Sequence, residues 1–96
     1  MNKPLFIPLY REYFELFESG VKTTEYRVDG PRWNKKTCYP GRKVTISYGY
    51  GKIKRLTAEI DNTYTMQPGP EDFQKIYGSI PTCRVIHLKS ISKIDL

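Results

Sequence analysis

The nine residues SGVKTTEYR, at positions 19–27, join a predicted helix to a predicted strand and bring Lys22, Glu25 and Arg27 within six positions. From Thr23 to Val28, alternation places Glu25 and Arg27 on one face of the strand. Strict alternation would place Lys22 on the opposite face. We therefore expect it to reach the same pocket only from the turn that precedes the strand.

The residues before this stretch predict an amphipathic helix from Leu9 to Ser19. Its aromatic residues have i, i+3, i+4, i+7 spacing and form one predicted apolar stripe: Tyr10, Tyr13, Phe14 and Phe17. Gly20 is a natural end for the helix, because a residue without a Cβ adopts the left-handed conformation at no steric cost.

The rest of the chain is rich in predicted strands. A first strand covers Leu5 to Pro8, and a loop containing Trp33 and Tyr39 follows the strand that carries Arg27. The remaining predicted elements are two paired strands, Arg42 to Tyr48 and Ile53 to Tyr64, a short helix from Glu71 to Tyr77, and a strand from Cys83 to Leu88 with an extension toward Ile91. The expected core faces of the paired strands are Val44, Ile46 and Tyr48 on one and Leu56, Ala58 and Ile60 on the other. Five or six short, mostly antiparallel strands and two helices predict a β-rich α+β fold, a small closed or nearly closed barrel.

The composition fits one globular domain over residues 1–96. The net charge of +6 favours an anionic partner such as nucleic acid, although it would also serve solubility alone. No apolar stretch is long enough for a membrane span, and the first residues have no apolar signal core, so we expect a cytoplasmic protein. Cys38 and Cys83, with His87, form neither a disulfide framework nor a zinc motif. We expect reduced thiols and no metal or organic cofactor.

The pattern G-x-K-x-x-E-x-R, formed by Gly20, Lys22, Glu25 and Arg27, resembles the signature of the ASCH family of PUA-like β-barrels. Trp33, and Pro40-Gly41 before the strand Lys43-Val44-Thr45-Ile46, also fit the spacing of that family. The resemblance implies a barrel with a cleft lined by the motif lysine, carboxylate and arginine. It further implies binding of RNA or a nucleotide. Some members are hydrolases of acylated cytidine nucleosides, or ribonucleases.

The chemistry of the motif side chains agrees with a phosphate or base site. The planar fork of Arg27 can hold a phosphate or a base edge, and Lys22 adds a point charge. Glu25 could accept from a base amino group, or it could hold Arg27 in a structural ion pair. Trp33, Tyr39, Tyr50 and Tyr64 lie in or beside predicted loops, where each could stack on a base or serve in packing.

The sequence leaves catalysis open. In hydrolase members of the family, a threonine activated by the motif lysine lies two residues before the arginine, and here that position is Glu25. Thr24 is expected to face away from Glu25, so a threonine nucleophile is in doubt, whereas Lys22 and Glu25 could act as acid and base on a water. Glu71 could be a second pocket carboxylate or only a helix-start charge, and His87 is expected to be structural. The alternatives to RNA or nucleotide binding are therefore a small hydrolase acting on acylated cytidine or on RNA, and a protein-interaction module.

Overall fold

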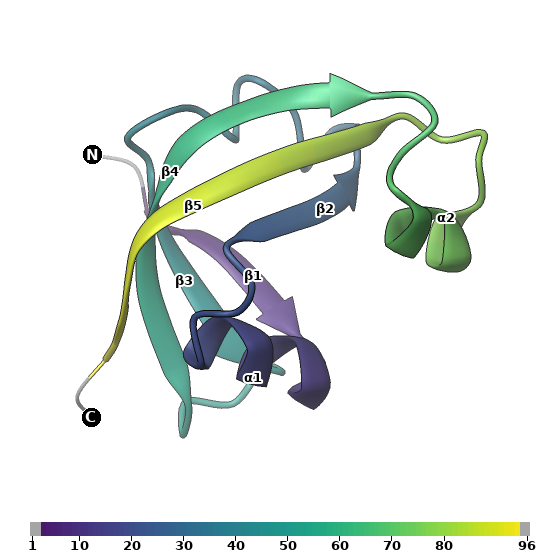
Figure 1. Cartoon of the computed structure of the whole chain (residues 1–96). Helices are drawn as coiled ribbons and strands as arrows, with labels where there is room; N and C mark the ends of the chain where they lie inside the picture. The colour runs from purple at the N-terminus through teal and green to yellow at the C-terminus, as the bar shows by residue number, and fades with distance from the viewer. Residues whose placement is uncertain (1–2, 95–96) are drawn as a thin grey trace.

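The computed structural model describes residues 3–94, which form a five-stranded curled sheet and two short helices (Figure 1). In chain order the elements are β1 (Leu5–Leu9), α1 (Arg11–Glu18), β2 (Thr24–Val28), β3 (Lys43–Tyr48), β4 (Arg55–Met66), α2 (Glu71–Tyr77) and β5 (Cys83–Lys93). The predicted β-rich α+β fold is confirmed.

The strand order in the sheet is β1-β3-β4-β5-β2. β1 pairs with β3 in parallel, and the other three pairs are antiparallel. The ladder ends at β1 on one side and at β2 on the other, so the sheet curls into a half-barrel rather than closing by main-chain pairing. Arg27 bridges these two edge strands, because its Nη2 donates a hydrogen bond of 2.9 Å to the carbonyl oxygen of Pro8.

Two separate groups of buried side chains hold the fold together. The main core fills the concave side of the sheet, and α1 contributes Phe14 and Phe17 to it. A second cluster lies under α2, where Phe73 packs on Cys83 and Val85 of β5. Gly69 allows this close approach, because a Cβ at that position would come within 2.9 Å of the Cβ of Cys83. Figure 1 shows α2 beside the far end of β4 and β5, away from α1.

Several predicted boundaries were wrong, and each error has a physical cause. The first strand extends to Leu9, which is buried and aligned with Tyr48, so α1 begins at Arg11 instead of Leu9. The strand predicted from Ile53 begins at Arg55, because Ile53 lies in the β3–β4 turn and is 91% exposed.

The predicted core faces were mostly correct. Val44 and Ile46 of β3 are buried, as are the three residues predicted for β4. Tyr48 is the exception, because it lies at the end of β3, is 42% exposed and meets Phe14 edge-on at 6.0 Å between ring centroids. The aromatic stripe of α1 is also shorter than predicted, since Tyr10 precedes the helix and is exposed.

The two cysteines lie in different clusters, and the helices are short. Cys38 is buried in the main core and Cys83 in the second cluster, and both are free thiols. Within residues 3–94, no helix is long and apolar enough to cross a membrane.

Candidate functional site

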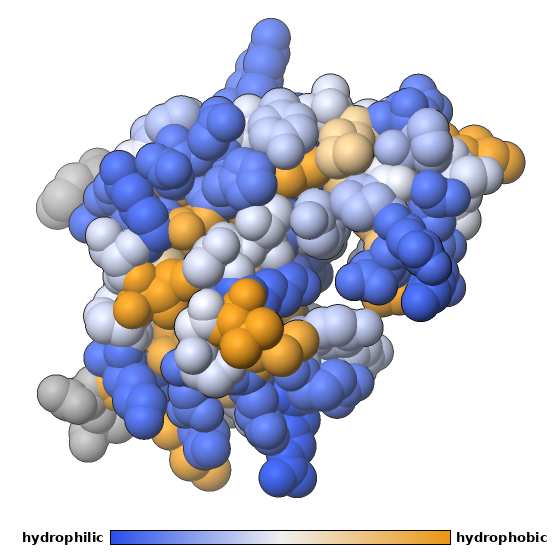
Figure 2. Space-filling model, viewed as in Figure 1, coloured by the Kyte–Doolittle hydropathy of each residue, from blue (hydrophilic) through white to orange (hydrophobic). Residues whose placement is uncertain are grey.

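A cleft of about 380 Å³ lies where α1, the edge strands and α2 face one another. One wall carries Tyr10, just before α1, and Tyr13 of α1, and the opposite wall carries Phe73 and Tyr77 of α2. Figure 2 shows a hollow between the lobe that contains α2 and the body that carries α1. The cleft therefore spans the two core clusters.

The floor of the cleft contains Lys22, Glu25 and Arg27, which the structure brings together. The carboxylate of Glu25 is the centre of the group. Its Oε1 lies 3.4 Å from Nζ of Lys22, and its Oε2 lies 2.8 Å from Nη2 and 2.9 Å from Nε of Arg27. Glu25 is only 4% exposed, so a charged carboxylate here depends on both cations. The three side chains together carry a net charge of +1.

The turn between α1 and β2 explains how Lys22 reaches this floor. Gly20 has a φ of +82°, and the main-chain N–H of Lys22 then donates to the carbonyl oxygen of Leu16. β2 begins only at Thr24, so strand alternation does not apply to Lys22. Aromatic rings surround its ammonium group, with Nζ at 5.1 Å from the ring centroid of Tyr13 and 5.8 Å from that of Tyr26. Cation–π attraction thus helps to hold this lysine in place.

Arg27 has a structural role beside its place in the cleft. Its guanidinium group lies 4.8 Å from the ring centroid of Trp33, in addition to its bonds with Glu25 and Pro8. Trp33 is 9% exposed and belongs to the main core. The structure therefore places Trp33 behind Arg27, where it supports the arginine rather than lining the cleft.

The other predicted aromatic residues lie in different places. Tyr50 is 78% exposed at the rim of the cleft and stacks on Phe6, with ring centroids 5.9 Å apart. Tyr64 lies away from the cleft on β4, where its hydroxyl is 3.2 Å from Nε2 of His87. Nδ1 of the same histidine is 2.8 Å from Oγ1 of Thr24. His87 is hydrogen-bonded through both ring nitrogens, which fits the structural role expected for it.

The first turn of α2 contributes a carboxylate that sequence reasoning missed. Glu71 is exposed on the outside of the helix, 3.8 Å from Lys75, whereas Asp72 lines the cleft. The face of α2 that lines the cleft carries residues 72, 73, 76 and 77, and Glu71 lies just outside this face. The sequence offered two adjacent acids at a helix start, but nothing in it gave the rotation of α2 about its axis.

Burial affects one tyrosine of the cleft. The pKa of the Tyr26 hydroxyl is raised, first by burial and then by the nearby Tyr64, Cys83, Asp72 and Glu25. The phenol thus stays protonated and can donate a hydrogen bond. Among residues 3–94 no three His, Cys, Asp or Glu side chains cluster as a metal site would require.

Comparisons with known proteins support the fold. No family model matches the sequence, and no curated protein sequence matches it. The structure is similar to the crystal structure of a mutant of ZmASCH from Zymomonas mobilis, with a TM-score of 0.67 and 15% sequence identity. The match covers 99% of this chain and 77% of that chain. The ASCH-type fold predicted from the motif of residues 19–27 is thereby confirmed.

Proposed function

We propose, from the ASCH-type fold and the geometry of the cleft, that this protein binds one nucleotide unit, of RNA or of a free nucleotide. The observation that carries the proposal is the buried carboxylate of Glu25, held between Lys22 and Arg27 at the floor of an aromatic cleft.

The polar floor suits the edge of a nucleobase. Glu25 presents acceptor oxygens, and a base amino group is a donor that could bind to them. Lys22 and Arg27 add donors for a base carbonyl or a phosphate. A nucleotide that offers both a donor and an acceptor would bind Glu25 and the two cations together. No buried charge at the floor of the cleft would then be left without a partner.

The walls suit the flat faces of a base and its sugar. Tyr10 and Tyr50 are exposed at the rim, and Phe73 and Tyr77 of α2 pack together, with ring centroids 4.8 Å apart. Aromatic stacking is worth about 1–3 kcal/mol per base and tolerates any base. A cleft of about 380 Å³ lies within the usual range for small-molecule sites.

The hydrolase alternative would need a nucleophile, usually a threonine, in the cleft. Among the described residues that line the cleft there is no threonine or serine. Thr24 lies with His87 on the other face of β2, as alternation predicted. Only water attack assisted by Lys22 and Glu25 would remain, and both groups are already committed to an ion pair. Binding is therefore the function that we propose, and turnover of acylated cytidine, abolished by Lys22→Ala, would overturn this choice.

An amide NMR titration with the four ribonucleoside 5′-monophosphates tests the proposal. We expect shifts in residues 22–27, 49–51 and 72–77, and none in residues 89–93 on the far side of the sheet. Glu25→Gln should weaken binding at least tenfold. If that variant does not fold, Tyr50→Ala offers the same test from an exposed position. Unchanged spectra at millimolar nucleotide, or shifts spread evenly over the surface, would overturn the proposal.

A further inference from the structure

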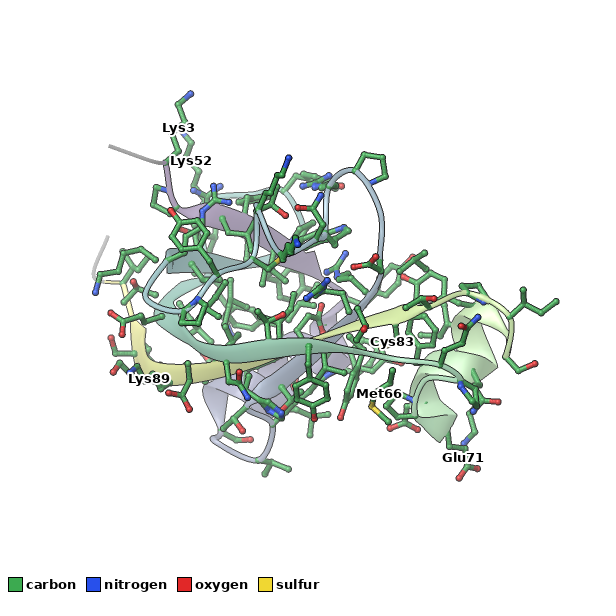
Figure 3. All side chains as sticks on the ribbon, turned by 90° about the horizontal axis from the view of Figure 1, so that it is seen from above. Lys3, Lys52, Met66, Glu71, Cys83 and Lys89 are labelled. Atoms are coloured by element: carbon green, nitrogen blue, oxygen red, sulfur yellow. The ribbon has the colours of Figure 1, made fainter. Side chains whose placement is uncertain are left out.

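The second half of β4 has a neighbouring strand on one side only. As far as Ile60, β4 pairs with β3 and with the residues just before it, because main-chain hydrogen bonds join Ile60 to Gly41 and Arg42. β5 continues alongside β4 to Met66, whereas in the described part of the chain no strand pairs with the other side of residues 61–66. Figure 1 shows this half of β4 at the top of the sheet, above β5, and Figure 3 gives the view from above onto it, toward Met66. We call residues 61–66 the free edge.

The register of the sheet determines which main-chain groups point out of the free edge. The N–H of Leu88 donates to a carbonyl oxygen just before β2 over 2.8 Å, so Leu88 directs its main chain toward β2. In an antiparallel ladder this direction alternates along the strand, so Val85 directs its main chain toward β4 and its partner there, Tyr64. On either side of Tyr64, Thr63 and Thr65 therefore direct their N–H and carbonyl groups away from β5.

The N–H of Thr63 agrees with this direction. It donates to Oδ1 of Asn62 over 2.9 Å, so a neighbouring side chain stands where a strand partner would be. Every residue of the free edge except Thr63 is exposed, so a second strand has access to it. Edge strands are commonly protected by lysine or proline, and residues 61–66 contain neither. An added strand would exchange the Asn62 contact for a main-chain hydrogen bond.

Both ends of the pairing region are defined. A shift of register between Ile60 and Asn62 marks a β-bulge at one end, and Pro68, which has no N–H, follows the other. Residues 62–66 are therefore the part of β4 that can accept a new strand. They contain no charged side chain, so a second copy of the same stretch would not place like charges opposite each other.

The free edge is complementary to itself in antiparallel orientation. With a twofold axis at Tyr64, Thr63 of each copy lies opposite Thr65 of the other. Both threonines direct their main-chain groups into the pairing, so each facing pair can exchange both of its N–H···O bonds. The same register places Tyr64 opposite its own copy. Threonine–threonine and aromatic pairs are among the favourable cross-strand pairs.

We propose that two copies of this protein pair through the free edge, so that β2, β5 and β4 of each copy form one continuous sheet across the twofold axis. A second copy fits better than an unrelated peptide, because one register matches the threonines and the tyrosine without a charge conflict. None of residues 61–66 lines the cleft, so the inference does not depend on nucleotide binding. Such a short pairing buries less than the roughly 1,200 Å² of a stable interface, so the dimer should form at millimolar and dissociate at micromolar protein.

A cysteine at the proposed axis tests the pairing. Facing residues that do not share hydrogen bonds have Cα atoms about 4.5 Å apart, which is within disulfide range. Under mild oxidation, Tyr64→Cys should therefore give at least about fivefold more covalent dimer than Tyr50→Cys, a matched change at an exposed tyrosine away from the free edge. The native Cys38 and Cys83 are buried and should not compete. Equal yields from the two variants would overturn the proposal.

The two threonines test the register. A mixture of Thr63→Cys and Thr65→Cys should cross-link more than either variant alone, because each position faces the other and not itself. This mixture also provides the test if Tyr64→Cys does not fold. Cross-linking that is as strong within each variant as in the mixture would overturn the proposed register.

The unaltered protein provides the third test. We expect the amide signals of residues 61–67 to shift as protein concentration rises, and sedimentation to show a dimer that strengthens with salt, because each chain carries a net charge of +6. Thr65→Pro should abolish the shifts while keeping the fold, because the N–H that it removes is not used in pairing with β5. A monomer at millimolar protein, or equal association in Thr65→Pro, would overturn the proposal. Association that weakens with salt would also overturn it, because that result indicates a polyanion between the chains.

Discussion

Arg27 binds the main chain of Pro8 at the place where the β-ladder stops, with 2.9 Å between Nη2 and the carbonyl oxygen. One side chain thus links the two edge strands and also pairs with the buried Glu25. The same arginine is therefore part of the fold and part of the candidate site, and a loss of binding in an Arg27 variant needs a measurement of folding beside it.

Replacing Arg27 should lower stability markedly. Arg27→Ala leaves the carboxylate of Glu25 buried with a weaker partner and opens the gap to β1, so we expect a loss of about 3 kcal/mol in the free energy of unfolding. Arg27→Lys keeps the charge but not the planar guanidinium group, and should lower the free energy of unfolding by about 1–2 kcal/mol. Urea denaturation measures both. Arg11→Ala, which removes an exposed i,i+4 pair with Glu15, is the matched control and should cost less than about 0.5 kcal/mol. Equal losses for Arg27→Ala and Arg11→Ala would contradict the bridging role.

Tyr50 should contribute to binding and not to folding. Tyr50→Ala removes an exposed ring at the cleft rim, and we expect nucleotide affinity to fall by roughly tenfold, in line with about 1–3 kcal/mol for one stacked base. Ile53→Ala, in the same turn but outside the cleft, provides the control and should bind as the unaltered protein does. Isothermal titration calorimetry compares the two. A Tyr50→Ala variant with full affinity would show that the ligand does not stack at this rim.

Asp72 and Glu71 allow a test of charge in the cleft. Asp72→Asn removes a negative charge that faces the ligand, so binding of a monophosphate should strengthen by a factor of about 2–5 at low salt, because nearby charges are poorly screened there. Glu71→Gln makes the same change in charge one residue earlier, outside the cleft, and should have little effect. If both variants strengthen binding equally, the effect is one of overall charge and not of the site.

Cys83 should make stability fall at alkaline pH. Burial, followed by the charge of Glu25, raises the pKa of its thiol to about 11 from 9.0. The folded state thus retains a proton that the unfolded state loses, so this contribution is fully present below about pH 9 and is lost as pH rises toward about 11. Urea midpoints measured from pH 8 to 11 should decline less steeply in Cys83→Ala than in the unaltered protein. The thiol should also react slowly with thiol reagents at pH 8 unless urea is added. A parallel decline in the two proteins would contradict a buried, protonated Cys83.

The sequence predicted the elements and the floor of the cleft better than its walls. Local signals were sufficient to predict that Glu25 and Arg27 share one face of β2, because strand alternation fixes the face on which each side chain lies. Lys22 needed the turn geometry at Gly20, which alternation cannot describe. The wall formed by Tyr10 and Asp72 depends on how α1 and α2 dock, and helical periodicity does not tell which end of an apolar stripe stays uncovered. For Trp33 the sequence left base stacking and packing open, and the structure places its ring in the core.

The second cluster under α2 has a consequence for the kinetics of the site. Because Phe73 is anchored to Cys83 and Val85 apart from the main core, we expect the amides of α2 to exchange with deuterium through local opening, faster than those of β3 and β4. A ligand that touches both walls would suppress this opening, and its observed dissociation constant would include the free energy of closing α2 over it. Tightening the cluster should therefore raise affinity mainly by slowing release, without altering any group that contacts the ligand.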